Sequence, residues 1–180
     1  QVPADVWRAI ITPTRQPFPR ARFFAETLGC TTEQAGALAG AGIAGRRLTL
    51  ELTEGAIIHD PARVAKALTA LKMFDVRIAM DDFGTGFTSL ASLQKMPIDI
   101  LKIDQSFVSD MFANGDSAAI VRAVLSLARA LGMETTAEGI DCEHLAQLLT
   151  ELGCTYGQGF HFAEPLTAAD ALAYALALNA

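Results

Sequence analysis

Short apolar segments alternate with helix-like segments along most of the chain. From residue 47 onward, apolar runs predict strands, and apolar residues at helical spacing predict the helices between them. The expected strands cover residues 48–52, 76–80, 98–103, 134–137 and 156–162, and the expected helices cover residues 61–73, 89–95, 117–131, 143–152 and 168–178. Strands that alternate with helices form a parallel sheet covered by helices. The fold class is therefore α/β, and the short connections favour a TIM-like (β/α) barrel.

The N-terminal part follows this pattern less clearly, because prolines interrupt it repeatedly between Pro3 and Pro19. Residues 5–10 are expected to form a short helix. Residues 31–44 are expected to form a longer one, which begins at a threonine cap and ends at glycines. We expect a single domain over residues 1–180, with a divergent or incomplete N-terminal part at 1–46 and regular βα units at 47–180.

Polar residues stand at or near the end of each of five successive expected strands. They are Glu51, Asp81 with Asp82, Lys102 with Asp104, Glu138 and Gln158. In a (β/α) barrel the C-terminal ends of the strands converge on one face, which carries the catalytic residues. Carboxylates that converge so closely repel one another unless cations hold them. The pattern therefore predicts a metal site on this face.

The strand expected at 76–80 leads directly into two adjacent acids, Asp81 and Asp82. Neighbouring strand residues point to opposite faces, so both acids can serve one site only where the strand ends and the backbone turns. We therefore expect a loop that starts at Asp81 and contains Gly84 and Gly86. The same residues also fit a turn and a helix cap that bind no metal.

Composition excludes several classes of function. The net charge is −6, and no basic cluster predicts a nucleic-acid partner. No apolar run reaches the ~18 residues of a membrane span. Cys30, Cys142 and Cys154 lack the spacing of metal ligands and are expected to be free thiols in a reducing, cytoplasmic compartment.

Because the sequence starts at Gln1 rather than Met, we expect a fragment of a longer protein, whose other segments would carry any membrane anchor.

Five motifs occur in order along the chain: Glu51-Leu52-Thr53-Glu54, Asp81-Asp82-Phe83-Gly84-Thr85-Gly86, Lys102-Ile103-Asp104, Ala137-Glu138-Gly139-Ile140, and Gln158-Gly159-Phe160 with Pro165. Together they resemble the EAL-domain family, the bacterial phosphodiesterases and receptors of cyclic di-GMP, over about residues 48–166. The resemblance implies a barrel that binds two Mg²⁺ or Mn²⁺ ions. It also implies hydrolysis of one phosphodiester of cyclic di-GMP to give pGpG.

The resemblance assigns roles to the matched residues. The implied metal ligands are Glu51, Asp81, Asp82 and Glu138, with Asp81 bridging the two ions. The implied catalytic residues are Lys102 at the attacking water or phosphate, Glu138 as general-base candidate, and Gln158 as a hydrogen-bonding residue. The implied loop supports are Glu54 and Asp104, and the implied substrate contacts are Phe162 and Pro165.

Two ligands of the family's metal site have no counterpart in this sequence. The Glu-Ala-Leu segment, whose Glu binds metal, is absent. Where an Asn ligand is expected upstream of Glu51, the chain reads Pro17-Phe18-Pro19-Arg20. Either some N-terminal βα units are lacking, or they belong to segments outside this sequence.

Two functions therefore stay open. The first is a cyclic di-GMP-specific phosphodiesterase that uses two metal ions, an activity expected for the parent protein and weak or absent in this chain. The second is a catalytically silent EAL domain that acts as a cyclic di-GMP receptor or a protein-interaction module. A homodimer through the loop between Asp82 and Ser89, and fused regulatory domains, are further expectations from the resemblance.

Overall fold

A computed structural model of the chain describes residues 7–11, 45–59, 61–86, 89–167, 170 and 174. Within this part, six strands form one sheet in the order β1-β2-β3-β4-β5-β6. The strands are β1 (Trp7–Ile11), β2 (Leu48–Thr53), β3 (Arg77–Phe83), β4 (Ile100–Ile103), β5 (Glu134–Ala137) and β6 (Tyr156–Gly157). Neighbours pair in parallel from β2 to β6, whereas β1 is antiparallel to β2. Consecutive strands thus lie side by side, as in a barrel.

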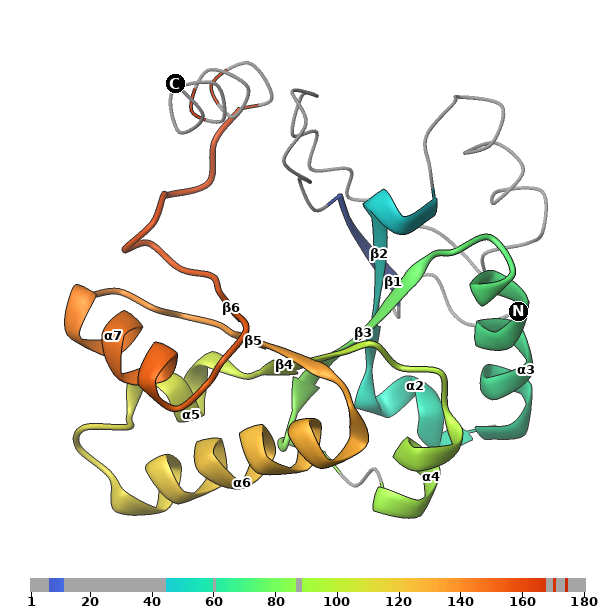
Figure 1. Cartoon of the computed structure of the whole chain (residues 1–180), viewed down its shortest axis with the longest axis horizontal. Helices are drawn as coiled ribbons and strands as arrows, with labels where there is room; N and C mark the ends of the chain where they lie inside the picture. The colour runs from blue at the N-terminus through green and yellow to red at the C-terminus, as the bar shows by residue number, and fades with distance from the viewer. Residues whose placement is uncertain are drawn as a thin grey trace.

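Helices follow most of the strands and lie around the outside of the curved sheet (Figure 1). They are η2 (Gly45–Arg47), α2 (Glu54–His59), α3 (Pro61–Lys72), α4 (Leu90–Lys95), α5 (Gln105–Ser109), α6 (Gly115–Leu131) and α7 (Glu143–Glu151). Each crossover from one parallel strand to the next contains at least one of them. In the described part, no helix is both long enough and apolar enough to cross a membrane.

The core lies between the sheet and these helices. The central strands are buried along their length, as their continuous apolar runs predict for a parallel sheet with both faces covered. Helix α3 turns a stripe of apolar residues at helical spacing, Val64, Leu68 and Leu71, towards the core. The fully buried side chains include Leu52, Ile78, Met80, Leu101 and Ile103. This apolar support holds the strand ends, where the polar residues lie.

Most of the predicted elements are confirmed, with bounds that differ by a few residues. The predicted short helix at residues 5–10 was wrong, because residues 7–11 form β1, whose backbone pairs with β2. The predicted final strand to residue 162 was also wrong, because β6 ends at Gly157. The chain then turns, and the N–H groups of His161 and Phe162 donate to Ile140 and Gly159. The helix expected at 31–44, and most of the one at 168–178, lie outside the described residues.

Candidate metal centre

Four neighbouring strands bring predicted site residues to one edge of the sheet. Glu51 lies on β2, Asp81 and Asp82 on β3, Lys102 on β4, and Glu138 directly after β5. Because these strands are parallel and consecutive, their C-terminal ends meet at the same edge. The sheet therefore brings together residues that are widely separated in the sequence.

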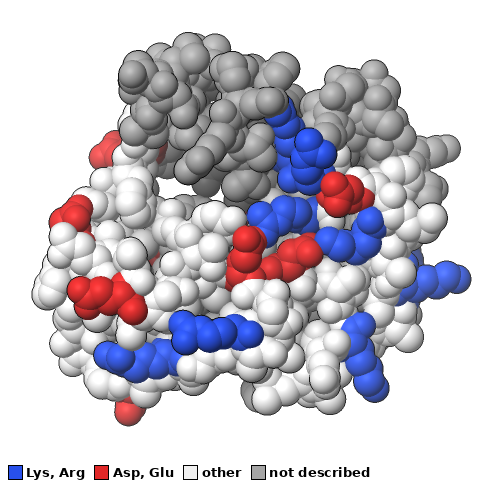
Figure 2. Space-filling view, in the orientation of Figure 1, with Lys and Arg blue, Asp and Glu red and all other residues white. Residues whose placement is uncertain are grey.

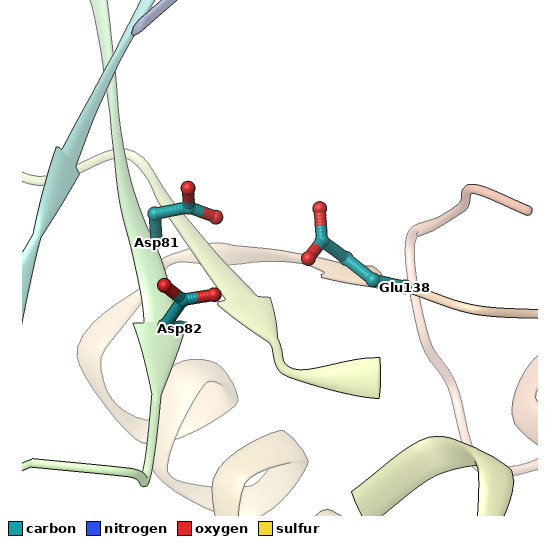
Figure 3. Close-up of side chains that lie close together, drawn as sticks. All are labelled: Asp81, Asp82 and Glu138. Carbon is teal, nitrogen blue, oxygen red and sulfur yellow. The ribbon is translucent and has the colours of Figure 1, made fainter. Parts of the chain in front are cut away.

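An irregularity in β3 lets both aspartates face this site. The prediction that the strand ends before Asp81 was wrong, since β3 continues through Asp82 to Phe83. The register with β4 shifts between Met80 and Phe83, and Asp82 has a left-handed φ of 54°. A bulge of this kind re-aims a side chain without ending the strand. Asp81 and Asp82 both point from β3 towards Glu138 (Figure 3).

Asp81, Asp82 and Glu138 form a group that fits a divalent cation. Each residue offers one carboxylate oxygen, and these oxygens lie within 4.8 Å of one another. Asp81 is buried, whereas Asp82 and Glu138 are half-buried. Hard oxygen donors are the ligands that Mg²⁺ and Mn²⁺ prefer. The donor set therefore suits the ions implied by the sequence motifs.

A buried lysine holds three carboxylates together. Lys102 Nζ lies 2.8 Å from Glu51 Oε1, 2.6 Å from Asp81 Oδ1 and 2.6 Å from Glu138 Oε1. We call these four residues the lysine cluster. Burial lowers the pKa of Lys102, but the three carboxylates outweigh it and raise that pKa above its ordinary value. Within the chain, a permanently charged lysine thus supplies a cation among the converging acids.

The lysine does not neutralise all the acids around it. Burial raises the pKa of Glu51 to about 7, and Lys102 offsets this only in part. Burial also raises the pKa of Asp82, as do the charges of Asp81 and Asp104. Figure 2 shows acidic and basic side chains side by side near the centre of the viewed face, with other charges spread around them. Four carboxylates, those of Glu51, Asp81, Asp82 and Glu138, gather here around one lysine, and this excess of acids favours the binding of a further cation.

We expect the metal-free protein to lose stability as the pH rises from 4.5, the ordinary pKa of Glu51, to about 7, its folded value. The folded state holds the Glu51 proton more tightly than the unfolded state. Stability from this proton is therefore complete below the unfolded pKa and is lost as the pH rises through the folded pKa. The loss should be about 3 kcal/mol. Urea unfolding in the presence of a chelator, at several pH values, measures it.

Glu51→Gln is the matched variant for this pH dependence. An amide keeps the shape of the side chain but does not titrate, so the free energy of unfolding should change less over the same pH range. An identical pH dependence in Glu51→Gln and in the unsubstituted protein would contradict the assignment to Glu51.

The segment after the two aspartates contacts helix α2. Glu54, the first residue of α2, is buried, and its Oε1 accepts a hydrogen bond of 2.8 Å from the Gly84 N–H. A side chain at Gly86 would collide with the Glu54 carboxylate. Asp104 instead caps α5, where its Oδ1 accepts a hydrogen bond of 2.9 Å from the Ser106 N–H. The structure thus places Glu54 against this loop and Asp104 at the start of α5.

The other predicted residues follow β6. The Gln158 N–H donates to the Ala137 carbonyl over 2.8 Å, which ties the end of β6 to the end of β5. The Phe162 ring lies against Gly157, and Pro165 is exposed. Among the described residues, no side-chain hydrogen bond or ion pair joins Gln158, Phe162 or Pro165 to the lysine cluster. The structure therefore brings together the acids and Lys102, but not these three side chains.

Two glycines that allow close approach at the site, Gly139 and Gly159, occur in the sequence motifs but were assigned no role there. Gly139 has a left-handed φ of 72°, and a Cβ there would lie 2.6 Å from the Gln105 Cβ. A Cβ at Gly159 would overlap the Ile140 backbone. The available signal was that each glycine directly follows a predicted site residue. A glycine in such a position indicates a close backbone approach.

Comparison with known proteins shows which family this chain resembles. Residues 25–165 match the family model described as the EAL domain. The bifunctional diguanylate cyclase/cyclic di-GMP phosphodiesterase MucR of Pseudomonas aeruginosa is 40% identical over 126 residues, which make up 70% of this chain and 18% of MucR. The chain spans only 15–20% of the length of each of the first eight curated relatives.

Several solved protein structures are also similar to the structure of this chain. The structure of the PaMucR phosphodiesterase in complex with c-di-GMP has a TM-score of 0.74 at 36% identity, and the match covers 77% of this chain and 56% of that one. The manganese/cy-diGMP complex of Klebsiella pneumoniae BlrP1 at pH 9.0 has a TM-score of 0.70 at 30% identity, over 76% of this chain and 35% of that one. These likenesses confirm the predicted α/β fold of the TIM-like barrel type.

Proposed function

This chain belongs to the EAL domain family, and we propose that its site binds two Mg²⁺ or Mn²⁺ ions and hydrolyses cyclic di-GMP to pGpG. The observation that carries the proposal is the group of three carboxylate oxygens within 4.8 Å of one another, beside a buried lysine. The relatives support it, because one is a cyclic di-GMP phosphodiesterase and another was solved with manganese and cyclic di-GMP.

The carboxylates at the strand ends are the proposed metal ligands. Asp81, Asp82 and Glu138 supply the grouped oxygens, and Asp81 is the proposed bridge between the ions, as the resemblance to the EAL-domain family implies. Glu51 is a further proposed ligand on the neighbouring strand, in contact with Lys102. Divalent ions in such a site neutralise phosphate charge and lower the pKa of a bound water.

Lys102 is the proposed contact to the phosphate or to the attacking water. Three carboxylates hold its ammonium in place, and its raised pKa keeps it charged. A fixed cation stabilises negative charge that develops during reaction, since it needs no reorganisation. Glu138 is the proposed general base. Its side chain is 17% exposed, against 3% for Glu51, so it has better access to water.

Residues around this centre have proposed supporting roles. Glu54 is proposed to hold the loop after Asp82 through its hydrogen bond with Gly84. Asp104 is proposed to support the same region by capping α5. The proposed role of Gln158 is hydrogen bonding at the site. The proposed substrate contacts are Phe162 and Pro165, which are both exposed in the segment after β6.

A receptor function is the second candidate. The observation that favours it is the lack of the Glu-Ala-Leu segment and of the Asn ligand in these 180 residues. A site without these ligands holds metal less tightly, because Mg²⁺ requires a nearly complete octahedral shell. The segment after β6 does not depend on those ligands. Cyclic di-GMP would then bind without being cleaved.

The test is incubation of the 180-residue chain with cyclic di-GMP and Mn²⁺, with pGpG followed by chromatography. We expect slow, Mn²⁺-dependent formation of pGpG that stops on addition of a chelator. The rate should be more than ~100-fold below that of a relative with all its ligands, since one ligand or supporting residue accounts for ~10–100-fold. Binding of cyclic di-GMP without product would favour the receptor. Neither binding nor product would contradict both functions.

A further inference from the structure

Helix α5 lies between the two segments that carry the grouped carboxylates. On one side is Gly84, where an added Cβ would lie 3.2 Å from Cε2 of the Phe107 ring. On the other side is Gly139, where an added Cβ would lie 2.6 Å from the Gln105 Cβ. Both glycines are therefore in close contact with α5. The helix acts as a spacer between the end of β3 and the end of β5.

These two glycines are close in sequence to the proposed metal ligands. Gly84 comes two residues after Asp82, and Gly139 directly follows Glu138. The separation of the two segments therefore decides how far the Asp82 carboxylate lies from the Glu138 carboxylate. Three ligand oxygens within 4.8 Å of one another require that this separation be held.

Asp82 needs such support more than its neighbours do. Its φ of 54° lies in the left-handed region, which non-glycine residues rarely adopt. A strained conformation persists only where the surrounding structure holds it. Gly84 is held from two directions, since its N–H donates to Glu54 and the Phe107 ring occupies the space that a Cβ at Gly84 would need. These contacts fix the backbone immediately after Asp82.

Helix α5 is itself firmly attached to β4. Asp104, which caps it, is separated from Lys102 by a single residue. Val108 is fully buried, and the Phe107 ring packs partly against the same core. A five-residue helix has little stability of its own, so the cap and the core contacts determine where it lies. The position of Phe107 is therefore defined relative to the strand that carries Lys102.

We propose that Phe107 is a positioning residue for the metal centre. Its ring holds the main chain at Gly84 and thereby fixes Asp82 relative to Asp81 and Glu138. Phe107 acts through the backbone and coordinates nothing itself. The inference rests on the proposed function, because it assigns metal binding to the three carboxylates.

The test compares Phe107→Ala and Phe107→Leu with Phe112→Ala. Phe112 is a matched control, because it is 52% exposed just beyond α5 and stacks on His144 rather than on the metal loops. Two quantities are measured: Mn²⁺ affinity by calorimetry, and amide hydrogen exchange at Gly84 and along β4 without metal. Phe107→Leu keeps an apolar side chain in the core, so the test remains valid if the alanine variant folds poorly.

We expect Phe107→Ala to weaken Mn²⁺ affinity by ~10–100-fold, as loss of a supporting residue does in other metal sites. Exchange at the Gly84 amide should rise about tenfold or more, because the segment opens locally, while the β4 amides stay protected. Phe107→Leu should show the same effects at a smaller size. Phe112→Ala should match the unsubstituted protein in both quantities.

Unchanged Mn²⁺ affinity and Gly84 exchange in both folded Phe107 variants would overturn the inference. An equal rise in exchange along β4 would also overturn it, since that would show general destabilisation. The proposed function fails separately: a protein that binds Mn²⁺ but neither binds nor cleaves cyclic di-GMP would refute it. A Phe107 effect on Mn²⁺ affinity would still support the positioning role in that case.

Discussion

Asp81→Asn is expected to abolish hydrolysis of cyclic di-GMP and to reduce the number of Mn²⁺ ions bound. Asp81 is buried, and one of its oxygens lies within 4.8 Å of ligand atoms of Asp82 and Glu138. A carboxylate that bridged the two ions would offset part of the positive charge of both, whereas an amide carries no charge. The expected loss of activity exceeds ~100-fold, which is already the upper range for a supporting residue. A calorimetric Mn²⁺ titration and an assay for pGpG measure the two effects.

Asp110→Asn is the control for this substitution. Asp110 is exposed at the C-terminal end of α5, so the same chemical change there should leave metal binding and hydrolysis unaltered. Unchanged Mn²⁺ stoichiometry in a folded Asp81→Asn protein would rule out the bridging role.

Lys102→Met is expected to cost the metal-free protein about 3–5 kcal/mol of stability at pH 7, the usual loss when one partner of a buried ion pair is removed. The substitution leaves Glu51, Asp81 and Glu138 clustered at the strand ends without their cation. The thermal midpoint should fall by ~10 °C for a domain of this size. Added Mn²⁺ should raise that midpoint again, because an ion that binds the folded state stabilises it. Hydrolysis should remain lost, because the proposed phosphate contact is gone.

Calorimetric or spectroscopic melting curves with chelator and with Mn²⁺ provide this measurement. Lys66→Met, at an exposed position on α3, should change the midpoint little under either condition. A Lys102→Met protein as stable as the unsubstituted one, at pH 7 and without metal, would show that the lysine cluster does not support the fold.

Local sequence pattern was sufficient for the central strands and for most helices. Residues 134–137 form a strand as predicted, and long helices such as α6 have a clear apolar periodicity. The pattern was insufficient for α2 and α5, which are too short to show a helical period. It also failed at residues 7–11, where pairing with β2 makes a strand of a segment expected to be helical. Such pairing is a long-range effect that local propensity does not contain.

The site was predictable as a set of residue types at strand ends, but its internal contacts were not. Parallel topology alone places Glu51, Asp81 and Lys102 at a common edge. Nothing in the sequence showed that Lys102 would contact three carboxylates at once, because those distances depend on strand register. The bulge at Asp82 was likewise hidden, since a shift in register involves the partner strand as much as the residue itself.

The order of the lysine cluster along the chain has a consequence for biosynthesis. Glu51 and Asp81 lie on adjacent strands and are both synthesised before Lys102, which follows Asp81 by 21 residues. At typical rates of translation Lys102 therefore emerges from the ribosome ~1–4 s after Asp81. During this interval, a nascent chain that has paired β2 with β3 holds Glu51 and Asp81 close together without the Lys102 ammonium. The free edge of β3 is also unpaired at that stage. A ribosome that stalls after Asp81 has emerged from it but before Lys102 has emerged would therefore present an intermediate prone to misassembly.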